Sequence, residues 1–172
     1  DGSELAGTYF LIVRTDNGSV LSQAAGAIPI TASGPIDVTR PVLPDLAVSN
    51  VQAPDQTIAD PATVTVTWTV TNLGGAAGAA GHWIDKVIAS KNAILGDGDD
   101  VVLGMFDRTG PFAAGDGYTP SEAITLPPEF TGRFTLFVKT DANEEVFEDG
   151  REANNVAAKS GFFDVIPVAY AD

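Results

Sequence analysis

The sequence contains no cysteine, one histidine and one methionine, and only 9 lysines and arginines against 23 aspartates and glutamates in 172 residues. The lack of cysteine excludes a disulfide scaffold, a thiol nucleophile and a cysteine-ligated zinc site. Because His82 is the only histidine, a multi-histidine metal centre is excluded as well. The net charge of −14 disfavours nucleic acids and anionic membrane surfaces as partners, since both carry negative charge. Apolar runs are far shorter than the roughly 20 residues that cross a bilayer.

What the sequence does contain is a two-residue periodicity of apolar side chains. In segment 63–71, Val64, Val66, Trp68 and Val70 alternate with threonines, as in a strand with one buried face. Further strands with this character are expected at 9–13, 46–51, 83–89, 101–106, 123–126, 134–139 and 157–166. Clusters of Gly, Pro, Asn and Asp separate them. The pattern predicts an all-β fold, an immunoglobulin-like antiparallel β-sandwich of about seven strands.

Two segments near the ends of the chain repeat each other. Leu5–Asp16 aligns with Phe130–Asp141, and Asp37-Val38 aligns with Asp164-Val165. The offset is about the length of one sandwich domain, which indicates a repeated unit.

This repeat predicts the domain organisation. Residues 43–172 form one complete sandwich, and residues 1–42 form the C-terminal third of a preceding or interrupted repeat, with two or three extra strands. We expect these extra strands to pack against a sandwich, because Tyr9, Leu11 and Val13 are apolar and a lone hairpin is only marginally stable. The chain begins at Asp1 and not at Met, so we expect it to be a piece of a longer protein.

Several motifs occur in order from Leu43 onwards. They are Pro44–Val48, Val66–Gly74, Trp83–Val87, Gly96–Gly104 and Thr140–Glu148. Together they resemble the CARDB family, the cell-adhesion-related domain of bacteria, over nearly all of 43–166. The resemblance implies an immunoglobulin-like sandwich, repeated in tandem in large secreted or surface-attached bacterial proteins. It implies no single activity.

The most acidic segment is 141–152. Counted from Asp141, oxygen-bearing side chains stand at positions 3, 5, 9 and 12, the spacing of ligands in a calcium loop. Position 6 is Val146 and not glycine, and strands flank the segment, so it is not an EF-hand. The alternative is that these side chains hydrogen-bond to the backbone of a turn. The candidate Ca²⁺ ligands are Asp141, Asn143, Glu145, Glu148, Asp149 and Glu152.

A second acidic cluster precedes the strand expected at 101–106. Asp97, Asp99 and Asp100 are candidate Ca²⁺ ligands, or they belong to a plain turn with Gly98 at positive φ. If this cluster and segment 141–152 meet at one end of the sandwich, they share one ion.

Catalysis has little support in the sequence. His82 lies between Gly81 and Trp83 and has no nucleophile motif beside it. We therefore expect no enzyme but a structural spacer module of a large bacterial surface adhesin, stabilised by Ca²⁺ and located outside the cell. Its expected partners are neighbouring domains of the same polypeptide and, through the parent protein, host or biofilm ligands. The alternatives are a glycan- or peptide-binding module and an accessory domain of a secreted hydrolase.

Overall fold

The computed structural model describes residues 6–15, 30–76 and 81–168. The chain divides into two compact units, 1–41 and 42–172. In the described ranges, regular structure consists of strands apart from one 3-10 turn, Glu152–Asn154. No helix in those ranges is long and apolar enough to cross a membrane.

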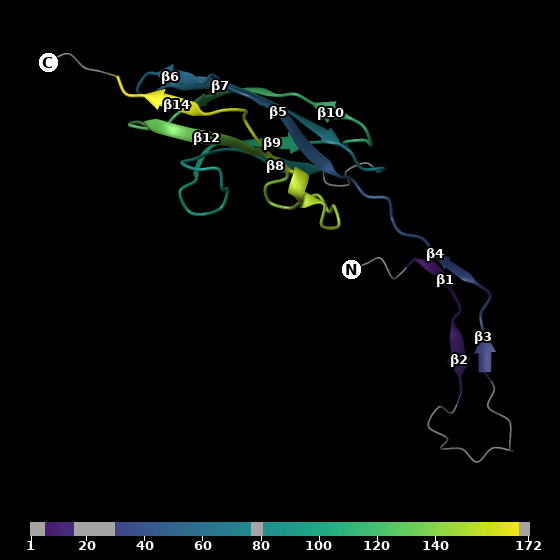
Figure 1. Cartoon of the computed structure of the whole chain (residues 1–172). Coiled ribbons are helices and arrows are strands. Elements are labelled where there is room, and N and C mark those ends of the chain that lie inside the picture. The colour runs from purple at the N-terminus through teal and green to yellow at the C-terminus, as the bar shows by residue number, and fades with distance from the viewer. Residues whose placement is uncertain (1–5, 16–29, 77–80, 169–172) are drawn as a thin grey trace. The chain divides into compact units, whose positions relative to one another are not determined.

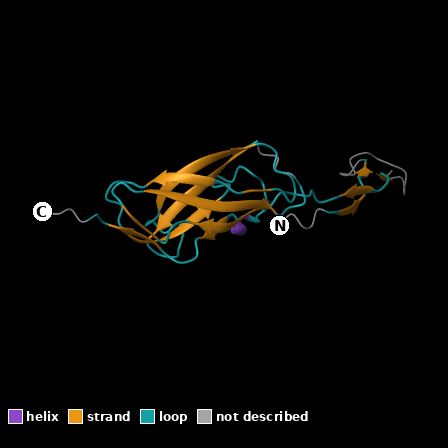
Figure 2. Cartoon of the chain, turned by 90° about the horizontal axis from the view of Figure 1, so that it is seen from above, coloured by secondary structure: helices purple, strands orange, loops and turns teal. Residues whose placement is uncertain are grey.

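The larger unit, which we call unit 2, is built from two sheets (Figures 1 and 2). In the first sheet, β7 lies between β5 on one edge and β10 with β11 on the other. The strands of this sheet are β5 (Leu46–Gln52), β7 (Thr63–Asn72), β10 (Gly117–Tyr118) and β11 (Ser121–Thr125).

The second sheet has the order β6-β14-β12-β8-β9, and β13 also pairs with β12. Its strands are β6 (Gln56–Ile58), β8 (His82–Ser90), β9 (Val101–Thr109), β12 (Gly132–Lys139), β13 (Val156–Ala158) and β14 (Phe163–Ile166). Neighbours are antiparallel except β6 and β14, which are parallel. β10 and β11 lie along one edge of β7, β13 and β14 lie along one edge of β12, and β5 and β6 are consecutive segments of a strand that passes from the first sheet to the second. Counted in this way the unit has seven strands, so the predicted immunoglobulin-like sandwich is confirmed.

The core follows the predicted periodicity. Val64, Val66, Trp68 and Val70 of β7 are all buried, and Trp68 is completely enclosed. They share one hydrophobic cluster with apolar residues of the second sheet, and each such side chain stabilises the fold by about 1.5–3 kcal/mol. The strand expected at 157–166 is instead two strands, because a turn with Gly161 at φ 74° interrupts it.

Gly74 follows β7 and packs against the backbone of residues 43–45, which lead into β5. A side chain does not fit at this position. A Cβ atom at this position would lie 2.6 Å from the carbonyl carbon of Pro44 and 2.7 Å from the amide nitrogen of Asp45. We therefore expect Gly74→Ala to lower the free energy of unfolding by at least about 1 kcal/mol, measured by chemical denaturation. Gly81→Ala is the matched control, because nothing lies within 4 Å of a Cβ there. Equal losses in the two variants would contradict this explanation.

The smaller unit, unit 1, is a two-stranded antiparallel arrangement in its described part. β1 (Gly7–Tyr9) pairs with β4 (Ile36–Val38), and β2 (Ile12–Arg14) pairs with β3 (Ile30–Ala32). The predicted strands are therefore present. Their predicted burial is not observed, because Tyr9, Leu11 and Val13 are 41%, 63% and 54% exposed. A two-stranded hairpin has no second layer to cover such side chains.

Candidate functional site

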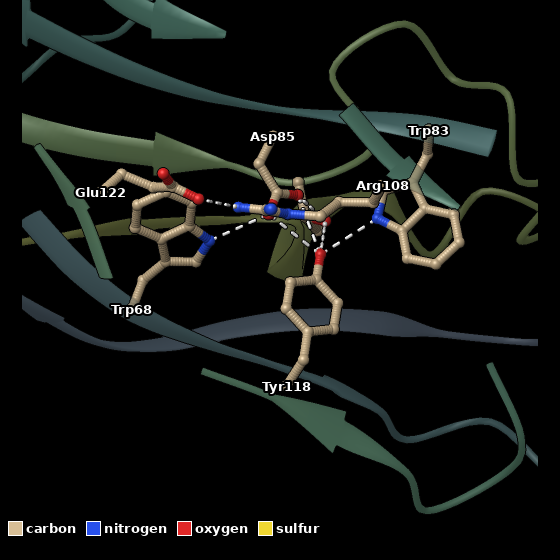
Figure 3. A network of polar contacts seen from close by, with 7 residues as sticks. Trp68, Trp83, Asp85, Arg108, Tyr118 and Glu122 are labelled. Atoms are coloured by element: carbon tan, nitrogen blue, oxygen red, sulfur yellow. Dashed lines mark hydrogen bonds and ion pairs between the residues drawn. The ribbon is translucent and has the colours of Figure 1, made fainter. Parts of the chain in front are cut away.

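The densest polar contacts of the described residues surround Asp85 on β8 (Figure 3). Its carboxylate is completely buried. It accepts hydrogen bonds from Trp68 Nε1 at 3.0 Å, Arg108 Nε at 3.0 Å, the Tyr118 hydroxyl at 3.0 Å and Thr140 Oγ1 at 2.7 Å. A buried carboxylate is tolerated only with such partners.

This network joins the two sheets. Trp68 and Tyr118 come from the first sheet, whereas Asp85 and Arg108 come from the second. The Arg108 guanidinium also lies 5.6 Å from the Trp68 ring and 5.5 Å from the Tyr118 ring, within the range of cation–π attraction. Burial, followed by the charge of Asp85, raises the pKa of Tyr118, so its hydroxyl stays protonated and donates. These groups hold the two sheets together.

A hollow of about 460 Å³ lies beside this network. Its lining includes Trp83, Arg108, Phe112, Tyr118 and Pro120. Trp83 is 3% exposed and its indole donates to the Tyr118 hydroxyl at 3.0 Å, so Trp83 belongs to the core. The rings of Trp83 and Phe112 in this lining are largely covered. The glycan- or peptide-binding alternative stays a prediction.

The Asp97–Asp100 loop joins β8 to β9 and brings three carboxylates together. Oxygens of Asp97, Asp99 and Asp100 lie within 4.8 Å of one another. The side-chain amide of Asn92 donates to Asp97 at 2.6 Å and to Asp99 at 2.9 Å, and Gly98 has φ 98°. Asp100 Oδ1 is shielded from solvent and has no hydrogen-bond partner among the described residues. The loop therefore has the turn geometry that the sequence allowed, together with converging oxygens.

The first half of segment 141–152 is a hydrogen-bonded loop. Asp141 is buried, and its carboxylate accepts the backbone N–H groups of Glu145 at 2.8 Å and Val146 at 3.0 Å. Burial raises the pKa of Asp141, against the effect of these two hydrogen bonds. Asn143 is exposed and accepts a hydrogen bond from Lys86 at 3.2 Å. Asp141 and Asn143, which the spacing predicts as ligands of one Ca²⁺, therefore have separate hydrogen-bond partners.

The second half of the segment contains a buried carboxylate, Glu148. Its Oε1 accepts the backbone N–H of Leu46 at 2.7 Å, whereas Oε2 has no hydrogen-bond partner in the described part of the chain. The adjacent Asn155 is also fully buried and its Oδ1 likewise lacks a partner, although its Nδ2 donates to Glu152 at 2.7 Å. Burial raises the pKa of Glu148 to about 7 and also raises that of Glu152. Asp149 is exposed, with φ 56°.

The two acidic loops lie at opposite ends of β8. The carbonyl of Ile84, near the start of β8, accepts the N–H of Ala142, whereas Ser90, the last residue of β8, donates to Asp99. The strand between these two contacts is about 20 Å long at the usual rise per residue. The two loops therefore do not meet at one end of the sandwich, so the condition under which they would share one ion is not met. The sequence does not specify which loops the strand directions bring together.

His82 is the remaining residue that the sequence singled out. It is exposed, its Nε2 lies 3.0 Å from Asp107 and its Nδ1 lies 3.5 Å from Glu145. The hydrogen bond to Asp107 raises the pKa of His82. These contacts describe a surface ion pair, and the expectation of a non-catalytic protein stays a prediction.

Sequence reasoning missed the Asp85 network. Asp85 lies on the same face of β8 as Trp83, Val87 and Ala89, and all four are buried. A carboxylate at an inward position of a strand was the available signal, and it indicates a buried acid that needs several donors.

Comparisons with known proteins agree with this fold. The CARDB family matches residues 43–159. The crystal structure of the CARDB domain of the PF1109 protein from Pyrococcus furiosus, in complex with di-metal ions, superposes with a TM-score of 0.52 at 18% identity, over 76% of this chain and 100% of that chain. The solution structure of the same domain gives a TM-score of 0.50 at 20% identity, over 73% and 97%. No curated protein matches. The chain belongs to the CARDB family.

Proposed function

We propose that this chain is a non-catalytic spacer module of a large extracellular bacterial surface protein, an adhesin, and that Ca²⁺ stabilises it. Membership of the CARDB family supports a structural role. The shape of unit 2 supports a spacer, because the chain enters at the β5 end of the sandwich and leaves at the other end, after β14 (Figure 1). A module connected in this way adds its length to the polypeptide.

The observation that supports a bound cation is that carboxylate oxygens of Asp97, Asp99 and Asp100 lie within 4.8 Å of one another. Ca²⁺ binds carboxylate oxygens, and clustered carboxylates repel one another without a cation between them. The buried Asp100 Oδ1, which has no hydrogen-bond partner among the described residues, is available as a ligand. The CARDB domain of PF1109 was solved with di-metal ions, which supports metal binding in this fold without specifying Ca²⁺ here.

Thermal and urea denaturation with EDTA and with Ca²⁺, at matched ionic strength, tests this proposal. A ligand that binds only the folded state at ten times its dissociation constant adds about 1.4 kcal/mol to the free energy of unfolding. We expect Asp100→Asn to abolish this gain. Glu152→Gln, in the opposite loop, is expected to retain it. Superimposable curves for the wild-type protein would contradict Ca²⁺ stabilisation, and loss of the gain only in Glu152→Gln would assign the ion to segment 141–152.

A further inference from the structure

The strands of unit 1 pair in the same register as the last strands of unit 2. The pairs of β1 with β4 lie at positions that the sequence repeat aligns with β12 and β14, and the pairs of β2 with β3 correspond to those of β12 with β13. Gly7 with Val38 corresponds to Gly132 with Val165, and Tyr9 with Ile36 corresponds to Phe134 with Phe163. Ile12 with Ala32 corresponds to Phe137 with Ala158, and Arg14 with Ile30 corresponds to Lys139 with Val156. Unit 1 is therefore the structural equivalent of β12, β13 and β14.

Finer contacts agree with this equivalence. The backbone N–H of Ser33 donates to the carbonyl of Leu11 at 2.8 Å, as that of Lys159 donates to the carbonyl of Leu136 at 2.8 Å. A cross-strand polar pair is also kept in the same place. Thr8 donates to Asp37 at 2.7 Å in unit 1, and Arg133 donates to Asp164 at 2.8 Å in unit 2.

The two hairpins differ in what covers them. In unit 2 the apolar side chains of these strands are at most 3% exposed; they are Phe134, Leu136, Val138, Phe163 and Val165. The equivalent side chains of unit 1 are 41% to 63% exposed; they are Tyr9, Leu11, Val13, Ile36 and Val38. We call β12, β13 and β14, the last strands of unit 2, its closing hairpin. Unit 1 thus presents the apolar face of such a closing hairpin, but without the layer that covers this face in unit 2.

Unit 2 shows what that covering layer is. β8 pairs along the outer edge of β12, β6 pairs along the outer edge of β14, and the first sheet covers the apolar face. Thr140, directly after β12, donates to the buried Asp85 of β8. Thr15 occupies the equivalent place after β2, so the hairpin retains the donor for an acid at the position of Asp85.

We propose that unit 1 is the closing hairpin of a second sandwich of the same fold, and that its partner is a segment equivalent to residues 43–129. The partner's strand equivalent to β8 lies along the edge of β1 and β2 and carries a buried aspartate opposite Thr15. The proposal rests on the spacer role and adds a defined partner to it. It does not depend on Ca²⁺, so the denaturation experiment that tests Ca²⁺ stabilisation and the experiment below, which tests the partner of unit 1, can fail separately.

The test adds a copy of residues 43–129 directly ahead of Leu5 in the full chain, because Leu5 aligns with Phe130. The copied Asp55 would lose its partner Lys159, but Asp55 is 91% exposed and tolerates the loss. We expect amide exchange of residues 7–14 and 36–38 to slow by at least about 100-fold relative to the 172-residue chain, because these amides become part of a cooperative sandwich. Leu11→Asp is expected to abolish this protection in the extended protein. The same substitution in the 172-residue chain is expected to leave the unfolding of unit 2 unchanged.

If the added copy of residues 43–129 does not fold, a second variant still tests the proposal. Residues 130–166 of the full chain are replaced by residues 5–39, so that unit 1's hairpin closes unit 2. Dispersed amide resonances and cooperative unfolding of this variant would support the proposal. Unprotected amides in a folded extended protein would overturn it, and so would an unfolded replacement variant combined with an unfolded added segment.

Discussion

Replacing Asp85 with alanine is expected to lower the free energy of unfolding of unit 2 by about 3–5 kcal/mol, the usual cost of removing one partner of a buried ion pair. The substitution leaves the Arg108 side chain, which is only 19% exposed, without its 3.0 Å carboxylate contact. It also removes the acceptor of the Trp68 indole and of the Thr140 hydroxyl. Buried donors without an acceptor each cost about 1–3 kcal/mol, although these costs are not additive.

Urea denaturation of Asp85→Ala against Asp107→Ala measures this effect. Asp107 is an acid on the neighbouring strand with a side chain that is 78% exposed, and its removal is expected to change stability by no more than about 0.5 kcal/mol. Asp85→Ala combined with Arg108→Met is expected to recover part of the loss, because the second change removes a mostly buried charge whose remaining carboxylate partner is Glu122, at 3.2 Å. A loss below 1 kcal/mol in Asp85→Ala would show that the network contributes little to the fold.

The sequence was sufficient for the strands whose pattern is local. The alternation in 63–71 predicted β7 and its buried face, and the match between Leu5–Asp16 and Phe130–Asp141 predicted that unit 1 forms strands. These predictions depend on neighbouring residues within one strand, where side chains alternate between two faces. The exposure of Leu11 was not predictable in this way, because it depends on which other strands are present.

The candidate sites show the same limit. Asp97, Asp99 and Asp100 converge because they lie within four residues of one another. The environment of Glu148 is set by Leu46, which is far away in the chain. Likewise, the four partners of Asp85 come from four different strands or their ends, and only the pairing of those strands brings them together. Spacing therefore identified the turn and the acidic cluster, but not which carboxylates are buried.

The second large effect concerns Glu148. We expect the stability of the wild-type protein to fall as the pH rises from 4.5 to 7, measured in EDTA by urea denaturation. The folded-state pKa is raised by burial to about 7, against 4.5 for an unperturbed glutamate. Between these values the unfolded chain releases the proton while the folded chain retains it, so deprotonation favours unfolding. The difference corresponds to about 3 kcal/mol once the pH exceeds 7.

Glu148→Gln is expected to remove this dependence. The glutamine oxygen can still accept the N–H of Leu46, and glutamine carries no charge that burial would disfavour. The variant should therefore match the wild-type protein at pH 4 and exceed its stability by up to about 3 kcal/mol at pH 8.

Glu129→Gln is the matched control, because Glu129 is exposed, and it is expected to keep the wild-type pH profile. A smaller slope of the same sign should persist in Glu148→Gln, since burial also raises the pKa of Asp141 and of Glu152. If Glu148→Gln were less stable than the wild-type protein at pH 8 in EDTA, the buried carboxylate would be stabilised in its charged form, and the cause assigned to its raised pKa would be wrong.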